Sequence, residues 1–206
     1  MAQLQSFLWP QSGADSVCPK QNVMPGQAFQ FGTLYKPKIP FPHFVRTLLI
    51  SSPHNCTLSK IAIQGIVNGK PLKIEVTGPH ANTVETISAF SCLNSITLSG
   101  APAKDISIGL GSRGRLGWFQ PLSNFSMQTL MSKQDGSQCA WQLMGTLEDP
   151  ANVKDVESIL SPIGRSHDLQ HHSHLWTGIR GPFRFVCLNI FEAEPNDHIK
   201  TTFLQL

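Results

Sequence analysis

The sequence predicts an all-β protein with two antiparallel β-sandwich domains, Ig-like or jelly-roll-like, and an extended N-terminal arm. Three observations support this prediction. Short apolar and β-branched segments recur along the chain, turn residues separate them about every 8–12 positions, and only one segment is a fair helix candidate. Strands at this spacing are typical of sandwiches, whereas a parallel α/β fold needs a helix after most of its strands.

The first 26 residues form the predicted arm. They are polar and contain three prolines and two glycines, which disfavour a continuous helix or a central strand. We place the first sandwich at residues 27–114 and the second at 115–206, because the glycine-rich stretch 109–117 separates two series of strand-like segments. A chain of 206 residues is long enough for two small domains.

The strands of the first domain are predicted from apolar segments and one clear turn. Segments 29–35 and 44–51 flank a proline-rich connector at 36–42. In segment 61–78 the pair Asn68-Gly69 lies between two alternating runs, and this pair suits the positive φ angles of a type I′ hairpin turn. We therefore expect a hairpin at 61–78, followed by strands within segments 82–90, 94–100 and 104–111.

The second domain is predicted from segments of the same kind. Segments 118–131 and 137–150 predict strands around a turn at 134–136, and segments 183–194 and 198–206 predict the last two strands. The helix candidate is the short segment 151–164.

Composition favours an assembling protein over a nucleic-acid-binding one. Charged residues make up 14% of the chain, against roughly 25% in an average soluble domain. A surface with few charges suits coverage by neighbouring chains. The formal net charge is only +3 and the lysines and arginines are not clustered, so we expect no specific nucleic-acid partner.

Cysteine usage and the chain start point to synthesis in the cytosol. The five cysteines are scattered and form no Cys-x-x-Cys pair, which argues against a disulfide framework or a zinc ribbon. The N-terminus lacks the basic segment of a secretory signal, and no apolar run approaches the ~20 residues that a membrane-spanning helix needs. We therefore expect neither secretion nor a membrane partner.

Residues 109–114 (GLGSRG) match the Gly-x-Gly-x-x-Gly fingerprint of dinucleotide-binding enzymes. That fingerprint requires a helix that begins at the third glycine, because the helix N-terminus binds the pyrophosphate. Gly117 and Pro121 stand where this helix would have to grow, and proline costs about 3 kcal/mol inside a helix. We therefore interpret the stretch as a flexible turn between domains and predict no bound nucleotide.

Residues 167–176 (HDLQHHSHLW) contain four histidines. In a helix, His167 and His171 would share a face at a spacing that zinc sites use; in a strand, His172 and His174 would share one. The stretch lacks apolar periodicity and includes one carboxylate, Asp168, so we interpret it as a solvated loop and predict no metal.

The sequence contains no convincing catalytic arrangement, and we predict that the protein is not an enzyme. There is no Gly-x-Ser-x-Gly elbow, and His54 with Cys56 resembles a turn before a strand. Glu148 and Asp149 are adjacent at a strand end, where paired carboxylates usually form a turn. No catalytic, cofactor-binding or metal-binding residue and no cofactor is predicted.

Residues 61–100 resemble a segment found across many virion proteins of tailed bacteriophages. In that group a strand meets an Asn-Gly-like turn, and a "xETITGPN" strand, a "TV" strand, an aromatic-led "FKTVTSITVS" strand and a short glycine-flanked strand follow. The matching pieces here are Asn68-Gly69, 73–79 (KIEVTGP), Thr83-Val84, Phe90 with 94–99 (NSITLS), and 106–109 (ISIG).

The resemblance continues into the second half and extends over about 44–206. Residues 145–150 (GTLEDP) are similar to a "TLDDP" strand ending, 184–190 (RFVCLNI) to a near-terminal "IRLNI" strand, and the ending at 203–205 also fits. The chain departs from the pattern at 89–92 (AFSC), where the group has Phe-Lys-Thr-Val. The histidine-rich loop and the 36–42 connector are particular to this chain.

The resemblance implies a non-enzymatic, homo-oligomeric structural protein of a phage virion, either a neck or tail ring component or a capsid decoration protein. The implied partners are further copies and other virion proteins such as portal, adaptor, tail or capsid. The implied location is the virion, after synthesis in the bacterial host cytoplasm. The alternative is a carbohydrate- or receptor-binding β module of a phage tail or fibre, which would need an exposed aromatic platform; Trp118, Trp141 and Trp176 are the candidates.

Overall fold

The computed structural model divides the chain into two compact units. It describes residues 3–9, 13–41, 44–121, 126–132, 139–152, 157–168, 174–180, 183–193 and 199–205. One unit is Ser12–Gly111, here the 12–111 unit. The other joins Met1–Gln11 to Ser112–Leu206, here the 112–206 unit. The described elements are β-strands in several antiparallel sheets and two short 3₁₀ turns, which confirms the predicted all-β, sandwich-like fold.

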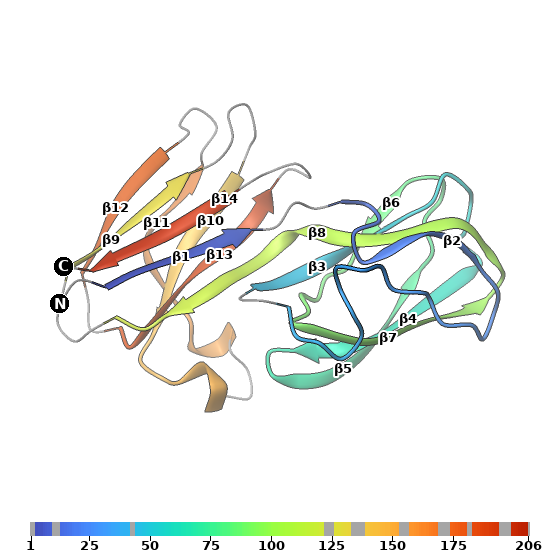
Figure 1. Ribbon diagram of the computed structural model, residues 1–206, viewed down its shortest axis with the longest axis horizontal. Coiled ribbons are helices and arrows are strands. Elements are labelled where there is room, and N and C mark those ends of the chain that lie inside the picture. The colour runs from blue at the N-terminus through green and yellow to red at the C-terminus, as the bar shows by residue number, and fades with distance from the viewer. Residues whose placement is uncertain are drawn as a thin grey trace. The chain divides into compact units, whose positions relative to one another are not determined.

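The 12–111 unit has two layers of strands (Figure 1). One layer is the three-stranded sheet β5-β4-β7. The other has the order β2-β8-β3-β6. The bounds are β2 (Cys18–Val23), β3 (Phe44–Ser51), β4 (Ser59–Val67), β5 (Lys70–Thr77), β6 (Thr83–Glu85), β7 (Cys92–Gly100) and β8 (Ala103–Phe119), of which the part up to Gly111 belongs to this unit.

The alternating sequence of β4 and β7 builds the apolar core of this unit. In the register Ile61 lies opposite Leu98 and Ile63 opposite Ile96, and all four side chains are buried. Side chains alternate between the two faces of a strand, so the neighbouring positions carry polar residues on the outer face. There Lys60 donates to Thr77 across the sheet at 2.8 Å.

The predicted hairpin is confirmed. The turn residues Asn68 and Gly69 have φ angles of 50° and 75°, as a type I′ turn requires, and they join β4 to β5. Strand β5 is an edge strand, so its inward-facing apolar residues are less covered than those of β4. Leu72, for example, is still 37% exposed.

An irregular segment covers the other edge of this sheet. Main-chain N–H groups at Gly26, Phe29, Lys38 and Phe41 donate to carbonyl groups of β7 and its flanking residue Ser91, at 2.7–2.8 Å. The strand predicted at 29–35 is therefore not observed: isolated bridges lie on either side of it, at Ala28 and Pro40. Prolines in this stretch lack an N–H group and cannot extend a ladder, which explains the intermittent bonding.

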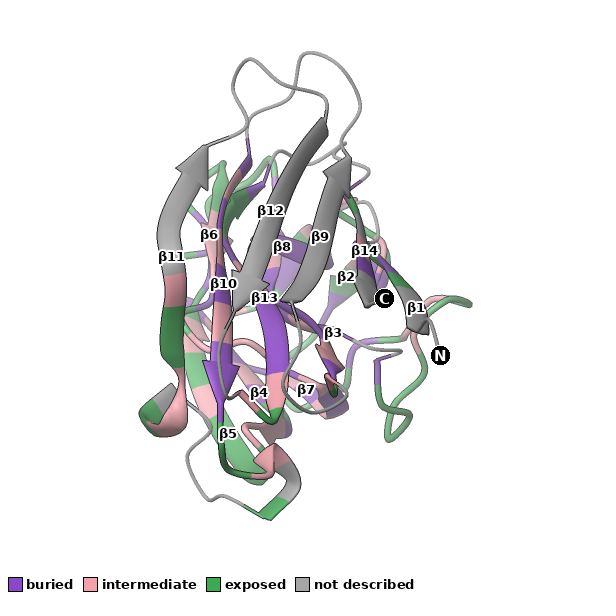
Figure 2. Ribbon diagram, turned by 90° about the vertical axis from the view of Figure 1, so that its left-hand side faces the viewer, coloured by how far each residue is buried: buried purple, intermediate pink, exposed green. Residues whose placement is uncertain are grey.

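The 112–206 unit contains a four-stranded sheet, β1-β14-β9-β12, and the strands β11-β10-β13 that continue onto β8. Its bounds are β1 (Gln3–Trp9), β9 (Ser126–Ser132), β10 (Cys139–Thr146), β11 (Ser161–Asp168), β12 (His174–Arg180), β13 (Phe185–Ala193) and β14 (Ile199–Gln205). Buried positions follow β10 and β13 (Figure 2). Phe119 and Phe203, from different sheets, stack in the core with ring centroids 5.1 Å apart.

The free arm predicted at residues 1–26 is not what the structure shows. Strand β1 pairs with β14 along its whole length and buries Phe7 and Trp9, while β2 pairs with β8 in the other unit. Burial alternates along the second half of β1, with Phe7 and Trp9 buried and Ser6 and Leu8 exposed, so this is a strand with one buried face. The unit boundary is Gly111/Ser112 instead of 114/115, and it falls inside the continuous strand β8.

The helix predicted at 151–164 is also not observed. Two 3₁₀ turns, Pro150–Asn152 and Glu157–Ile159, flank residues outside the described part, and β11 begins at Ser161. Pro162 and Gly164 are poor helix formers, and the open edge of β10 supplies partners for a strand. Within the described residues, no helix is long and apolar enough to cross a membrane.

Candidate functional site

The GLGSRG motif lies within strand β8. The strand runs from Ala103 to Phe119 without interruption, so extended chain occupies the place where a nucleotide-binding helix would have to begin. The flexible turn that we predicted here is wrong as well. The motif therefore lacks the helix N-terminus that gives the fingerprint its affinity for a pyrophosphate.

Close packing explains two of these glycines. A Cβ atom at Gly109 would collide with the main-chain carbonyl oxygen of Gly13, and one at Gly111 would collide with the side chains of Thr47 and Glu85. Neighbouring segments approach the β8 backbone so closely that only glycine fits. The sequence pattern thus reflects packing inside the 12–111 unit.

Gly111 belongs to a buried polar cluster around Arg46. The Arg46 side chain is fully buried, and its Nε atom donates to the Gly111 carbonyl at 2.9 Å, with Nη2 donating to the same oxygen. Thr47 donates its hydroxyl to the Glu85 carboxylate. Burial lowers the pKa of Arg46 to about 9, and the charges of Tyr35 and Glu85 act in the opposite direction. Arg46 is therefore a cation at neutral pH.

Aromatic residues lie next to this cluster. The Tyr35 ring packs edge-on against Phe41 and Phe44, with centroid distances of 5.2 and 6.3 Å. Burial raises the pKa of the Tyr35 phenol above its ordinary value, and the charge of Arg46 offsets part of this increase. Two donors of Arg46 point at a main-chain carbonyl inside the sandwich, so the cluster fixes β3 against β8 and does not present a charge to a ligand.

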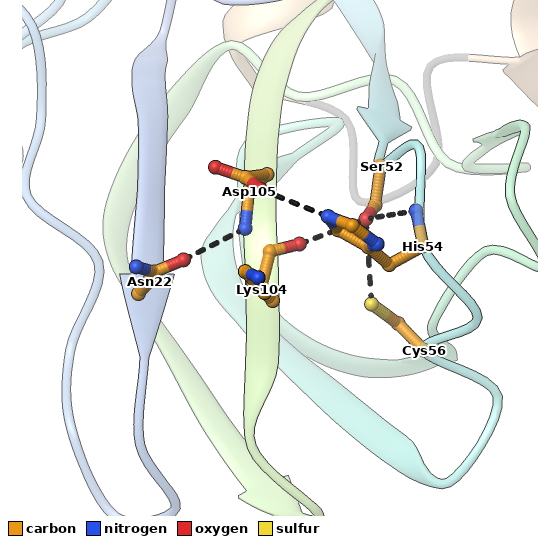
Figure 3. Close-up of polar contacts among 6 residues, drawn as sticks. All are labelled: Asn22, Ser52, His54, Cys56, Lys104 and Asp105. Atoms are coloured by element: carbon orange, nitrogen blue, oxygen red, sulfur yellow. Dashed lines mark hydrogen bonds and ion pairs between the residues drawn. The ribbon is translucent and has the colours of Figure 1, made fainter.

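A second polar cluster joins residues 52–56 to the start of β8 (Figure 3). His54 Nε2 lies 2.9 Å from Asp105 Oδ2, and these side chains are 44% and 38% exposed. The buried Ser52 hydroxyl donates to the Lys104 carbonyl at 2.9 Å and accepts the main-chain N–H of His54 at 3.1 Å. The Cys56 thiol also donates to Ser52 Oγ, at 3.5 Å.

These contacts stabilise the 52–56 loop, and they do not activate the Ser52 hydroxyl as a nucleophile. Ser52 Oγ bonds to the main chain of His54 instead of its ring, and its proton is committed to Lys104. Asp105 has a positive φ of 46°, and its N–H bonds to Asn22 Oδ1 at 2.9 Å, so β2 joins the same cluster. Sequence reasoning noted His54 and Cys56 but missed Ser52 and Asp105. No local signal connects positions about 50 residues apart.

The structure tests the histidine-rich segment only in part. His167 and Asp168 end β11, which pairs with β10, whereas His174 begins β12, which pairs with β9 in a different sheet. His171 and His172 lie outside the described residues, and so do the side chains of the others. In the part of the chain that the structure describes, no three His, Cys, Asp or Glu residues are grouped as metal ligands would be.

The remaining candidates occupy structural positions. Trp141 is fully buried, and Trp118 is half-buried with the Arg115 guanidinium 5.3 Å from its ring centroid; the side chain of Trp176 lies outside the described part. Glu148 stands in a turn at the end of β10. All five cysteines are buried, and burial raises the pKa of the Cys18 thiol to about 12. The described tryptophans therefore do not form the exposed platform that the carbohydrate alternative requires.

No family model matches the chain, and no curated protein matches it. Among solved structures it is similar to the crystal structure of the PBSX exported protein XepA, with 7% identity over 92% of this chain and 85% of that one and a TM-score of 0.30. A superposition with this TM-score carries no argument about fold or function.

Proposed function

We propose that the chain is a non-enzymatic structural protein of a tailed-phage virion, which assembles in many copies with itself and with other virion proteins. Its place in the particle would be a neck or tail ring or the capsid surface. The proposal is carried by one observation: the resembling motifs between residues 68 and 109 occupy consecutive elements of a single structural unit.

The motifs follow the order of the fold. Asn68-Gly69 is the turn between β4 and β5, and residues 73–79 continue through β5. Thr83-Val84 lies in β6, residues 94–99 in β7 and residues 106–109 in β8. The resemblance thus covers most of one sandwich instead of isolated strands, which supports carrying the class of protein over to this chain.

The surface of the 12–111 unit supports a role in assembly. Large apolar side chains are exposed on its loops and on edge strand β5: Met24, Leu34, Ile39, Leu58, Leu72 and Ile87. Burying such side chains against another chain is favourable, and apolar residues are concentrated in the centres of protein interfaces.

Side chains on loops are better contact elements than the edge of β5. Its edge includes Pro71, which has no N–H group, and charged residues at Lys70 and Lys73. Proline and lysine are devices that prevent edge-to-edge pairing of strands. We therefore expect assembly through loop surfaces, and not through strand addition at β5.

Mass spectrometry of purified particles tests the proposal. Particles from a host that produces the phage should contain the chain at a fixed stoichiometry, and an electron-microscopy map would separate a ring at one vertex from a coat on the capsid lattice. The matched control is the unassembled lysate fraction from the same cells. A chain abundant in that fraction but missing from particles would overturn the proposal.

A further inference from the structure

The two units carry formal charges of opposite sign. The 12–111 unit contains eight Lys and Arg against four Asp and Glu, which gives +4. The 112–206 unit contains eight against nine, which gives −1. Complementary charge steers association and selects orientation. In an assembly of identical copies, this asymmetry favours contact between the 12–111 unit of one copy and the 112–206 unit of the next.

The 12–111 unit presents a compact apolar and basic turn at residues 34–39. Leu34 is 77% exposed and Ile39 55% exposed, and the exposed Lys36 and Lys38 lie between them. Neither lysine forms an ion pair within the part of the chain that the structure describes. The turn thus combines the surface apolar area and the positive charge that an acidic, apolar partner surface would match.

Two main-chain hydrogen bonds stabilise this turn. The Ile39 N–H donates to the Lys36 carbonyl at 3.3 Å, and the Lys38 N–H donates to Leu93 in β7 at 2.7 Å. Tyr35 anchors its base against the aromatic residues of the core. A surface that is already ordered loses little conformational entropy on binding.

The 112–206 unit presents the complementary turn at residues 147–149. Leu147 is 62% exposed, and the acidic residues Glu148 and Asp149 follow it. The buried Thr146 hydroxyl accepts the Glu148 N–H at 3.0 Å and donates to the Glu148 carbonyl at 3.4 Å, which fixes the turn. Each turn therefore offers exposed leucine beside charge, and the two charges are opposite.

We infer that the 34–39 turn of one copy binds the 147–149 turn of a second copy, so that copies associate head to tail. This inference rests on the proposed function, because it names the surfaces through which the chain would self-assemble. A head-to-tail contact is heterologous, and its repetition gives a closed ring or an open filament.

Charge reversal tests the contact in the full-length chain. We expect Lys36→Glu and Glu148→Lys each to weaken self-association on the order of tenfold, because each replaces an attraction with a repulsion. The double variant, in which every copy carries both reversals, should recover most of the lost affinity. Sedimentation velocity and native mass spectrometry over a range of protein concentrations measure the effect.

Three further variants separate local contact from general charge. Lys70→Glu changes the charge of the same unit on a different surface and should leave association unchanged. Arg184→Gln removes a cation from the residue before β13, whose N–H donates to the Thr146 carbonyl at 2.9 Å, and should not weaken association with a basic turn. Leu34→Ser tests the apolar part of the turn and should weaken association without changing its salt dependence.

The outcomes distinguish this inference from the proposed function. If the chain self-associates but Lys36→Glu and Glu148→Lys behave as Lys70→Glu does, the two turns are not the contact and the inference is overturned, while the virion role stands. A chain that is present in particles yet monomeric in solution at every concentration also overturns the inference. If it is absent from particles, the proposed function fails.

Discussion

Two polar clusters in the 12–111 unit use charge in different settings. Arg46 in β3 is fully buried and bonds to the Gly111 carbonyl in β8. His54 and Asp105 form their pair near the surface, with side chains 44% and 38% exposed. Both clusters connect β8 to residues about 50–65 positions earlier in the chain.

The difference shows that burial decides how much each contact contributes to the free energy of unfolding. Water and salt screen the exposed pair, and such pairs stabilise proteins by about 0–1 kcal/mol. Removing a fully buried side chain is much more costly, because it leaves a cavity and takes away the donors of a buried carbonyl group. Mutations in the two clusters should therefore have clearly ranked effects on unfolding.

The largest effect is expected for Arg46→Ala, which should destabilise the 12–111 unit by about 3–5 kcal/mol. The variant leaves a cavity and removes the donors of the buried Gly111 carbonyl. All four tryptophans lie outside this unit, so their fluorescence reports on the 112–206 unit. Hydrogen exchange of peptides from 12–111 is therefore the measurement.

Arg46→Met is the matched control. It keeps most of the side-chain volume while removing the charge, so it should cost less than Arg46→Ala. Equal stability of Arg46→Ala and wild type in the exchange experiment would show that the buried cluster does not support the sandwich.

Gly111→Ala should have the next largest effect, a loss of about 1–3 kcal/mol. The added methyl group would collide with Thr47 and Glu85, and the same polar cluster would have to move. Gly13→Ala is the control, because the nearest atoms to its new methyl group are 3.6 Å away. If both variants unfold alike, the close approach at Gly111 does not explain the glycine.

These glycines illustrate what the sequence could and could not predict. Apolar and β-branched segments predicted β3, β4, β7, β8, β10, β13 and β14, and Asn68-Gly69 predicted the turn, because strand composition and turn chemistry are local. The role of Gly111 depends on Thr47 and Glu85, which approach it from other strands. A pattern of glycines alone does not predict which residues of other strands will pack against each glycine in the fold.

The errors have the same physical origin. β1 and β2 contain or adjoin proline and polar residues, so they resemble an arm until the partner strands β14 and β8 are known. The 29–35 segment is apolar enough for a strand, but it bonds to β7 only at intervals. For the candidate cluster in Figure 3, residue types were visible in the sequence, but the pairing of His54 with Asp105 required the fold.

Ser52→Ala should cost about 1–2 kcal/mol, less than the substitutions at the buried arginine. Ser52 is buried, and its hydroxyl bonds to Lys104, His54 and Cys56. The variant removes the donor of the Lys104 carbonyl and the acceptor of the His54 N–H. Faster hydrogen exchange confined to peptides that contain 52–56 and 104–105 is the expected signature, and Ser51→Ala on the exposed neighbouring bond to Thr83 is the control.

His54→Gln should have the smallest effect, at most about 1 kcal/mol. It removes the partner of Asp105 where water is available to solvate the carboxylate, and the Asp105 N–H keeps its bond to Asn22. Water surrounds the exposed pair, so its effect should stay well below that of Arg46→Ala at both low and high salt. Exchange measured at low and high salt for both variants checks this contrast. A His54→Gln loss as large as that of Arg46→Ala would mean that the surface pair, and not the buried arginine, holds β8 in place.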